Sequence, residues 1–386
     1  MAFIKIPCVI QRGGTSKGIY LHEKDIPQNP RLRDNVILSI FGSPDIRQID
    51  GLGGADPLTS KVAIIAPSKK ANCDVDYTFG AVDITEPIVD YSGNCGNISS
   101  GVGPFAIDEG LVKAIEGETQ VSIFNTNTNK ILKAHVPTAQ GIVQYFGDYT
   151  IAGVPGTGAK ILLNFAETAG SATGKILPTG NRVDKVSIPS IGTIDMSIID
   201  AGNPVCFIRP SVLKLTGAEH PNDKSVIKQL DKIELIRGTA AYMIGLVRDH
   251  KNARYESPSI PLLALVSEPQ DYTSFADNRI IEASEINLVA RVFYMQEMHK
   301  TYSITATVCT GTAAMINGTI VNQVATSKEV ESQIVCIGHP CGKLPIEMQV
   351  NDTNNMIKLI KANLGRTSRR IMDGYVYVNE SVYKNT

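Results

Sequence analysis

The stretch of the sequence that most restricts the fold runs from Ser92 to Leu111, SGNCGNISSGVGPFAIDEGL. It opens with turn residues and continues through small and apolar residues, while the acidic residues Asp108 and Glu109 come only at its far end. A helix without a polar face is buried on nearly all sides, and its small residues would let neighbouring strands approach closely. Pro104 fits poorly inside a helix, so we expect a kink or a late start.

Cys95 lies in the turn that opens this predicted helix. A thiol at the start of a helix is surrounded by unpaired N–H groups and lies at the positive end of the helix dipole, and both favour the thiolate. The same N–H groups can bind a carboxylate. One turn could therefore supply a base and an anion site together. The alternative is a buried, unreactive cysteine, which is the common role of a free cysteine.

The overall composition excludes several classes of protein. The chain has 386 residues with 43% hydrophobic and 19% charged residues, which is enough for two or three globular domains with sizeable cores. The net charge is −1, and no long basic run suggests a nucleic-acid or membrane-surface partner. We found no apolar run long enough to span a bilayer. Numerous glycines, prolines and β-branched residues indicate many strands and turns.

The cysteines favour a reducing compartment. There are seven of them, an odd number, and none has the spacing of a metal site. The first residues, MAFIKIPCVI, lack the pattern of a secretory signal. We therefore expect a cytoplasmic protein with reduced thiols and no bound metal.

Two glycine-rich loops in the first half carry further candidates. The loop Arg12–Gly18 contains Ser16 together with exposed amides and two cations, a combination that suits a carboxylate or phosphate ligand. The alternative is a plain hairpin turn, which has the same sequence pattern. The loop Asp50–Lys61 leads into the apolar strand 62–66. Lys61 lies at that junction, where a desolvated amine could serve as a base. Most lysines beside a loop simply point into water.

The second half of the chain echoes the first. Residues 194–212 read as strand, glycine turn and strand, as residues 9–26 do, and residues 166–182 read as the connection between the halves. We predict helices over 224–244 and 286–298. Cys309, in Val308-Cys309-Thr310-Gly311-Thr312, is again interpreted as a cysteine in a turn that opens a helix of small residues. On this interpretation each half has a thiol at a helix start.

These motifs together resemble a known family. The segments are RGGTSKG (12–18), DGLGGADPLTSK (50–61), SGNCGN (92–97), CTGTAA (309–314) and RRIMDGYVYV (369–378). They look like the PrpF family, which has the diaminopimelate epimerase fold and includes 2-methylaconitate isomerase, 3-methylitaconate Δ-isomerase and 4-oxalomesaconate tautomerase. The likeness covers nearly the whole chain.

The resemblance implies an α+β fold of two pseudo-symmetric domains, each a curved, mostly antiparallel sheet around a central helix. We expect them over residues 1–185 and 186–386, with the last strand returning to the first domain and the active site between them. The family works without a cofactor or metal. It implies Lys61 and Cys95 as catalytic residues, and Cys309 matches the second thiol of the epimerases. A homodimer is expected only by analogy with the family.

The function expected is an isomerase that moves a double bond by allylic proton transfer in an unsaturated di- or tricarboxylate such as 3-methylitaconate, 2-methylaconitate or aconitate. Either Lys61 or Cys95 would be the base. The candidate substrate-binding residues are Ser16, Asn94, Gly96, Asn97, Arg279, Cys309, Thr310, Gly311 and Thr312. Three alternatives remain open: a keto–enol tautomerase of the 4-oxalomesaconate type, an amino-acid epimerase or racemase with two thiols, and a carboxylate-binding protein without activity. The sequence does not identify the acid.

Overall fold

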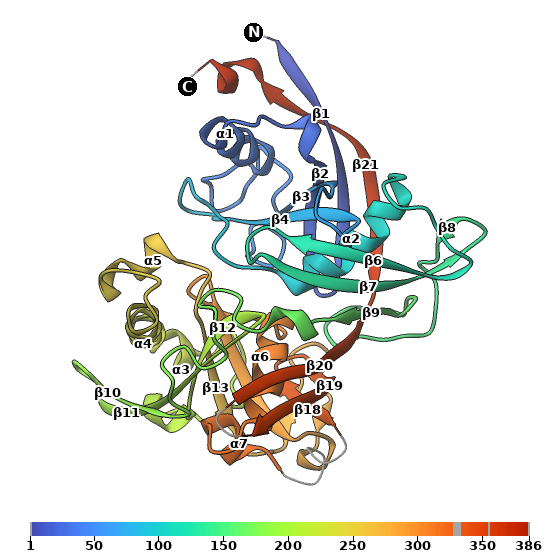
Figure 1. Cartoon of the computed structure of the whole chain (residues 1–386). Coiled ribbons are helices and arrows are strands. Elements are labelled where there is room, and N and C mark those ends of the chain that lie inside the picture. Colours follow the sequence, from blue (N-terminus) through green and yellow to red (C-terminus); the bar gives the residue numbers. More distant parts are fainter. Residues whose placement is uncertain (1, 327–332, 354–355, 385–386) are drawn as a thin grey trace. The chain divides into compact units, whose positions relative to one another are not determined.

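The computed structural model of the chain describes residues 2–326, 333–353 and 356–384. It divides into two compact units (Figure 1). Unit 1 contains residues 1–163 and 365–386, and unit 2 contains residues 164–364. The boundary therefore lies about twenty residues before the position expected from the sequence, because the turns that follow Asn164 belong to unit 2. In these turns, the backbone N–H groups of Ser171, Ala172 and Thr173 donate hydrogen bonds to the carboxylate of Asp200, which is also in unit 2.

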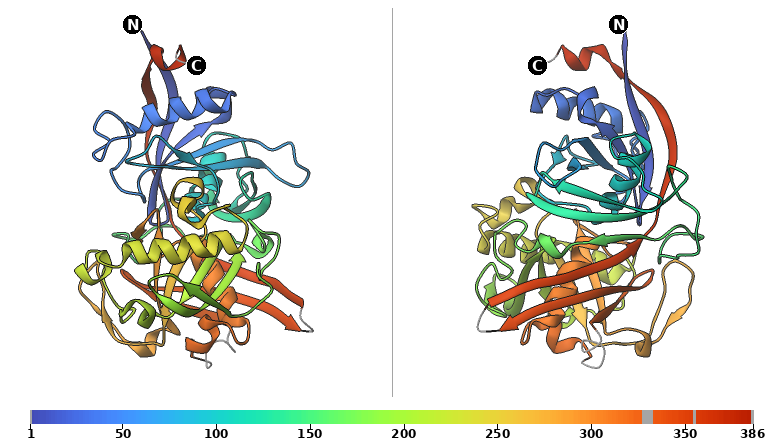
Figure 2. Two further views of the ribbon diagram at one scale, coloured as in Figure 1. Left: turned by 90° about the vertical axis from the view of Figure 1, so that its left-hand side faces the viewer. Right: turned by 45° about the vertical axis from the view of Figure 1, so that its right-hand side comes forward.

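Unit 1 is a mostly antiparallel sheet around one helix, α2 (Gly96–Asp108). Its strands are β1 (Phe3–Gly13), β2 (Ser16–His22), β3 (Lys61–Pro67), β4 (Val75–Val82), β5 (Val89–Asp90), β6 (Gly117–Asn125), β7 (Lys130–Ala139), β8 (Ile142–Val143), β9 (Ile161–Asn164) and β21 (Ser368–Asn379), with α1 (Pro30–Phe41) outside the sheet. The pairs β2–β3 and β4–β6 are parallel. The last strand, β21, pairs with β1 along nearly its whole length (Figure 2).

Helix α2 is enclosed as its sequence predicts. All of its residues from Gly96 to Ile107 are buried. A Cβ on Gly101 would lie 2.3 Å from the hydroxyl oxygen of Tyr20, so only glycine allows β2 to come this close. Pro104 lies inside the helix rather than at its start.

Unit 2 has the same connectivity around helix α6 (Ile304–Met315). Its strands are β10 (Asp184–Ile188), β11 (Gly192–Ala201), β12 (Asn203–Ile208), β13 (Leu262–Ser267), β14 (Tyr272–Thr273), β15 (Ile280–Ile281), β16 (Leu288–Tyr294), β17 (Glu297–Met298), β18 (Ile334–His339), β19 (Gly342–Thr353) and β20 (Met356–Arg366). The pairs β12–β13 and β16–β18 are parallel, as are β2–β3 and β4–β6 in unit 1. The α+β fold with two similar halves is confirmed.

Two helix predictions in unit 2 are wrong. Residues 286–298 contain β16 and β17 instead of a helix, since Leu288–Phe293 is a fully buried run, apolar except for Arg291, that pairs with strands on both sides. A short apolar run of this kind fits a central strand as well as a helix. The helix expected over 224–244 is interrupted at residues 228 and 229, which separate α3 (Lys224–Ile227) from α4 (Leu230–Met243). Unit 2 also contains the short helices α5 (Ala253–Glu256) and α7 (Ile320–Val324).

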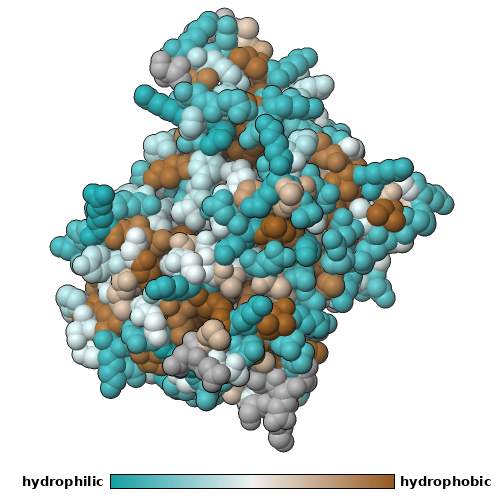
Figure 3. Space-filling model, viewed as in Figure 1, coloured by the Kyte–Doolittle hydropathy of each residue, from teal (hydrophilic) through white to brown (hydrophobic). Residues whose placement is uncertain are grey.

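Hydrophilic side chains cover most of the face shown in Figure 3, and apolar ones form separate patches, as is usual for a globular protein. Within the described residues, no helix is long and apolar enough to cross a membrane.

Candidate active site

Cys95 occupies the N-cap position of α2, where the chain leaves an extended conformation (φ −116°, ψ 101°) and enters the helix. Its side chain makes no capping hydrogen bond, unlike the serine or asparagine usually found at this position. The Cys95 thiol therefore does not cap the start of the helix. Cys95 is 7% exposed and stands beside the amides of the first helical turn, as the sequence predicts.

Lys61 brings an amine to this thiol. It is the first residue of β3 and is only 3% exposed, so its side chain does not point into water. Its Nζ donates hydrogen bonds to Ser16 Oγ at 3.2 Å and to Cys95 Sγ at 3.4 Å. Burial of an ammonium group is tolerated only when such partners replace its hydration. Three residues from separate loops of unit 1 thus meet around one point: the catalytic candidates Lys61 and Cys95, and Ser16.

The remaining candidates of unit 1 surround the start of α2. Asn94 is buried, and its Oδ1 accepts hydrogen bonds from Ser99 and Asn125 at 3.4 Å each. Gly96 is the first helical residue. The Oδ1 of Asn97 accepts a hydrogen bond from the backbone N–H of Thr15 at 3.2 Å. This hydrogen bond joins the glycine-rich loop directly to the start of α2. Apart from Lys61, the unit 1 candidates all lie in these two segments: Ser16, Asn94, Cys95, Gly96 and Asn97.

The expected placement of Cys309 is wrong. Helix α6 begins at Ile304, with Ser303 as the N-cap residue, so Cys309 lies in the middle of the helix. Its thiol is completely buried and donates to the carbonyl oxygen of Ile199 at 3.0 Å, and burial raises the pKa of Cys309 well above its ordinary value. The amides of Thr310, Gly311 and Thr312 also lie inside the helix, where they are used by the helix itself. This removes the geometric reason for assigning residues 309–312 to substrate binding.

Ser303 is the residue that the sequence analysis missed. Its side-chain oxygen accepts a hydrogen bond from the N–H of Ala306 at 3.2 Å and caps α6. In unit 1 the glycine turn packs on Asn97, two residues after the N-cap; in unit 2 Gly202 packs on Thr305, again two residues after the N-cap. Ser303 is thus the counterpart of Cys95. A serine with small residues after it is a common N-cap signal.

Arg279 lies on the exposed surface of unit 2. It follows a turn between β14 and β15, its side chain is 73% exposed, and its Nε pairs with Asp277 Oδ2 at 2.6 Å. An exposed ion pair of this kind is well solvated. The geometry gives no support to a role for Arg279 in holding a carboxylate.

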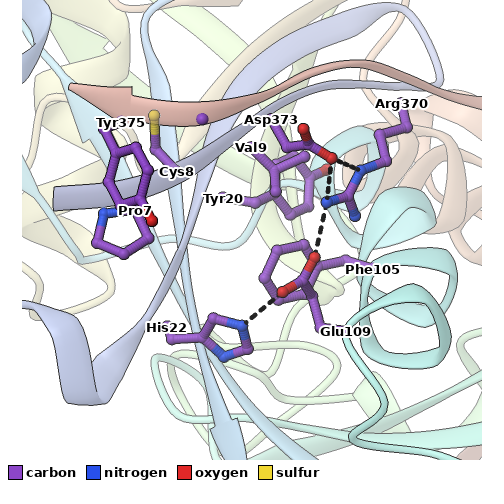
Figure 4. Close-up of a pocket in the computed structure, with 11 residues that line it drawn as sticks. Pro7, Cys8, Val9, Tyr20, His22, Phe105, Glu109, Arg370, Asp373 and Tyr375 are labelled. Carbon is purple, nitrogen blue, oxygen red and sulfur yellow. Dashed lines mark hydrogen bonds and ion pairs between the residues drawn. The ribbon is translucent and has the colours of Figure 1, made fainter.

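Unit 1 also has a cavity of about 320 Å³ at the far end of α2 (Figure 4). Glu109, the C-cap residue, accepts hydrogen bonds from Arg370 at 2.7 Å and interacts with His22 at 3.0 Å. Arg370 also pairs with Asp373 at 2.9 Å. Desolvation would raise the pKa of Glu109, but the hydrogen bonds from His22 and Arg370 lower it overall. Arg370 is thus paired with two carboxylates that line this cavity.

Comparison with known proteins agrees with the architecture. The model of the PrpF protein family matches residues 3–379. This chain belongs to the PrpF family. A 3-methylitaconate isomerase from Eubacterium barkeri is 52% identical over 379 residues, which cover 98% of each chain.

Solved structures extend the comparison of this PrpF member. The crystal structure of a methylitaconate-delta-isomerase has a TM-score of 0.78 and 51% identity, and the match covers 99% of this chain and 97% of that one. A hydroxyproline epimerase from Agrobacterium vitis has a TM-score of 0.58 at 12% identity, covering 98% and 95% of the two chains, which shows a shared fold alone. The epimerase-like fold expected from the sequence is confirmed. Among the described residues of this PrpF chain, no group of three or more His, Cys, Asp or Glu side chains could hold a metal ion.

Proposed function

We propose that this protein is a cofactor-independent isomerase that moves a carbon–carbon double bond in an unsaturated di- or tricarboxylate, with 3-methylitaconate as the first candidate substrate. The observation that carries the proposal is the buried contact between Lys61 Nζ and Cys95 Sγ at the start of α2. The choice of substrate is supported by the 52% identity to a 3-methylitaconate isomerase. The relatives are named for different acids, among them 3-methylitaconate, 2-methylaconitate and 4-oxalomesaconate, and the first of these has the highest identity of the three.

The reaction needs a base, an acid and a stabilised anion. In 3-methylitaconate, the base takes the proton from the carbon that carries the methyl group and a carboxylate. The electron pair spreads through the adjacent double bond to the methylene carbon, and a proton added there gives 2,3-dimethylbutenedioate. The overall change is one proton removed and one returned, with no oxidation. Positioned acid–base groups of this kind contribute a rate factor of about 10² to 10⁴.

Lys61 and Cys95 are the two groups that can move this proton. In one assignment a thiolate on Cys95 accepts the proton and the ammonium of Lys61 supplies one. The reverse assignment, with a neutral Lys61 as base and the Cys95 thiol as acid, uses the same contact. The amides of the first turn of α2, with Ser16, can bind the charge that develops on a carboxylate.

A racemase or epimerase with two opposed thiols is not favoured by the geometry. That mechanism needs a second reactive cysteine, and in unit 2 the helix start carries Ser303 while Cys309 is buried inside α6. The proposed isomerase needs only the pair in unit 1.

The test is the turnover of 3-methylitaconate, 2-methylaconitate and aconitate by Lys61→Ala and Cys95→Ser variants. Each variant should lose a factor of about 10² to 10⁴ in kcat, while Lys69→Ala, an exposed lysine on the same unit, should keep wild-type turnover. In deuterated water, the new methyl group should carry solvent deuterium. Near wild-type turnover in both site variants would contradict the proposal.

We also propose a cytoplasmic location, supported by seven cysteines that are all free. A homodimer remains an expectation of the family resemblance, and light scattering coupled to size-exclusion chromatography tests it.

A further inference from the structure

Arg366, the last residue of β20, is a buried cation with little to pair with. It is 2% exposed. Its Nη1 donates to the carbonyl oxygen of its own neighbour, Gly365, at 3.1 Å, and its Nε has no hydrogen-bond partner. Burial lowers the pKa of Arg366 to about 10, so the guanidinium is still charged at neutral pH.

The other buried arginines of the described residues make more hydrogen bonds. Arg237 pairs with Glu234 at 2.6 Å and also donates to several backbone carbonyls. Arg291, which likewise has no carboxylate partner within the described part of the chain, donates to the carbonyl oxygens of Glu219 at 2.7 Å and Ala290 at 3.0 Å. No carboxylate within ion-pair distance is found for Arg366 among the described residues. A buried charge is expensive unless an opposite charge and hydrogen bonds replace its hydration. An anion from outside the chain would supply the opposite charge that the described residues do not.

The position of Arg366 connects it to the candidate active site. Its Cδ lies 3.3 Å from the point that a Cβ on Gly14 would occupy, and the side chain of Asn97 lies against the same point. Gly14 donates its N–H to Thr367 at 3.0 Å, which fixes the segment that carries Arg366 to the glycine-rich loop. Two residues after Gly14, Ser16 accepts the hydrogen bond from Lys61.

Asn97 supplies a second donor without a partner. The residue is 1% exposed, and its Oδ1 is held by the N–H of Thr15 at 3.2 Å, which fixes the orientation of the amide group. Its Nδ2 has no hydrogen-bond partner. A buried donor left unsatisfied is uncommon in proteins and calls for an explanation. The two side chains that carry these donors, Arg366 and Asn97, both lie within 3.3 Å of the point that a Cβ on Gly14 would occupy.

We propose that Arg366 and the side-chain amide of Asn97 form a carboxylate-binding subsite beside the Lys61–Cys95 pair, which holds one carboxylate of an unsaturated dicarboxylate. This inference rests on the proposed isomerase function and replaces Arg279 with Arg366 as the arginine that recognises the substrate. A guanidinium presents two parallel N–H groups to a carboxylate, and charge-assisted bonds of this kind are strong. The carboxylate in turn neutralises the buried cation.

The test measures binding without turnover. Itaconate binding is measured by calorimetry in the Cys95→Ala background, with and without Arg366→Met. Loss of hydrogen bonds to a charged group should weaken the affinity about 10- to 100-fold. Arg369→Met, which changes an exposed arginine three residues away, is the matched control and should leave the affinity within about twofold. Arg366→Lys, which keeps the charge but not the fork of donors, should give an intermediate loss.

Thermal unfolding separates this role from a purely structural one. Because Arg366→Met removes an uncompensated buried charge, the melting temperature of the free protein should stay the same or rise, while the shift produced by itaconate should shrink. An unchanged affinity for itaconate in both Arg366 variants, or a melting temperature that falls with no change in the itaconate shift, would overturn the inference. Failure of itaconate to bind even when Arg366 is intact would instead count against the proposed function.

Discussion

Helices α2 and α6 are the central helices of the two units, and they differ at their N-cap residue. Both are buried almost completely and rich in glycine, alanine, serine or threonine. Cys95 begins α2 without making a capping hydrogen bond, whereas Ser303 begins α6 and its hydroxyl caps the helix. A side chain used to cap a helix is not available as a base. The two units share a scaffold, while the thiol that we propose as the reactive group, which makes no capping bond, stands at only one of these two helix starts.

The strand next to each helix shows the same contrast. In unit 1, Val62 of β3 pairs with Ile19 of β2, and Lys61 directly precedes it. In unit 2, Leu262 of β13 pairs with Val205 of β12, and the residue that precedes it is Pro261. At the positions of unit 2 that match Lys61 and Cys95, there is therefore neither an amine nor a thiol. Both members of the proposed proton-transfer pair are specific to unit 1.

The sharpest way to break this comparison is to remove each cysteine in turn. Cys95→Ala should lower kcat by a factor of about 10² to 10⁴, since it removes a group that contacts the reacting atoms. Cys309→Ala should leave kcat within about threefold and cost about 1 kcal/mol of stability through a small cavity. Steady-state kinetics with 3-methylitaconate and urea unfolding measure the two effects. A large loss of kcat in Cys309→Ala, with the fold intact, would revive the two-thiol mechanism.

A second prediction compares the packing of the two helices. Gly101→Ala in α2 should destabilise unit 1 by about 3 kcal/mol, because the new Cβ would lie 2.3 Å from the Tyr20 hydroxyl, which is itself held by Ile98 at 2.6 Å. Gly311→Ala in α6 should cost about 1 kcal/mol, because the atom in the way belongs to the flexible side chain of Met348 at 2.8 Å. Urea denaturation midpoints would show this order; equal losses would mean that both helices are packed with the same tolerance.

A third prediction concerns the caps. Ser303→Ala should destabilise the protein by about 1 kcal/mol, since it removes the hydrogen bond to the N–H of Ala306. Cys95→Ala removes no capping bond and should cost less. Ser303→Ala should also leave turnover of 3-methylitaconate nearly unchanged if chemistry is confined to unit 1. Thermal melts and kinetics on the same two preparations make the comparison, and a loss of turnover in Ser303→Ala would assign unit 2 a part in catalysis.

The smallest effect is expected at the other end of α2. The folded-state pKa of Glu109 lies below its ordinary value of 4.5, so its interactions stabilise the protein fully above about that pH and are lost as the pH falls through the lowered value. Glu109→Gln should therefore cost up to about 1 kcal/mol at pH 7. The difference from wild type should shrink as the pH falls below 4.5. Unfolding measured from pH 7 to pH 3 would show this trend, and a constant difference would exclude the carboxylate charge as its origin.

The sequence was most informative where one local segment determines the outcome. The turn around Cys95 predicts a buried helix with a thiol at its start, and the structure has both. The loop before Lys61 predicts a lysine at the start of a buried strand, which the structure also has. At both places the residues next to one another in the sequence are enough to predict the local structure, so no knowledge of distant partners is required.

The errors arose where the result depends on distant residues or on two equally good local signals. Cys309 and Ser303 are both plausible helix starts, and the capping bond that decides between them is seen only in the structure. The apolar run of β16 becomes a strand because β13 and β18 lie on its two sides. Arg366 was not recognised at all, since its contact with Gly14 joins the two ends of the chain and leaves no pattern in either segment.

The pairing of β21 with β1 makes unit 2 an insertion between two parts of unit 1. A ribosome therefore delivers β1 before unit 2 and its partner strand only after all of unit 2 has been synthesised. The sheet of the unit that carries the proposed Lys61–Cys95 pair is thus completed after unit 2, and removal of residues 365–386 would delete Arg366 together with the neighbour of β1. Nascent chains should thus acquire protease resistance in unit 2 before they do so in unit 1.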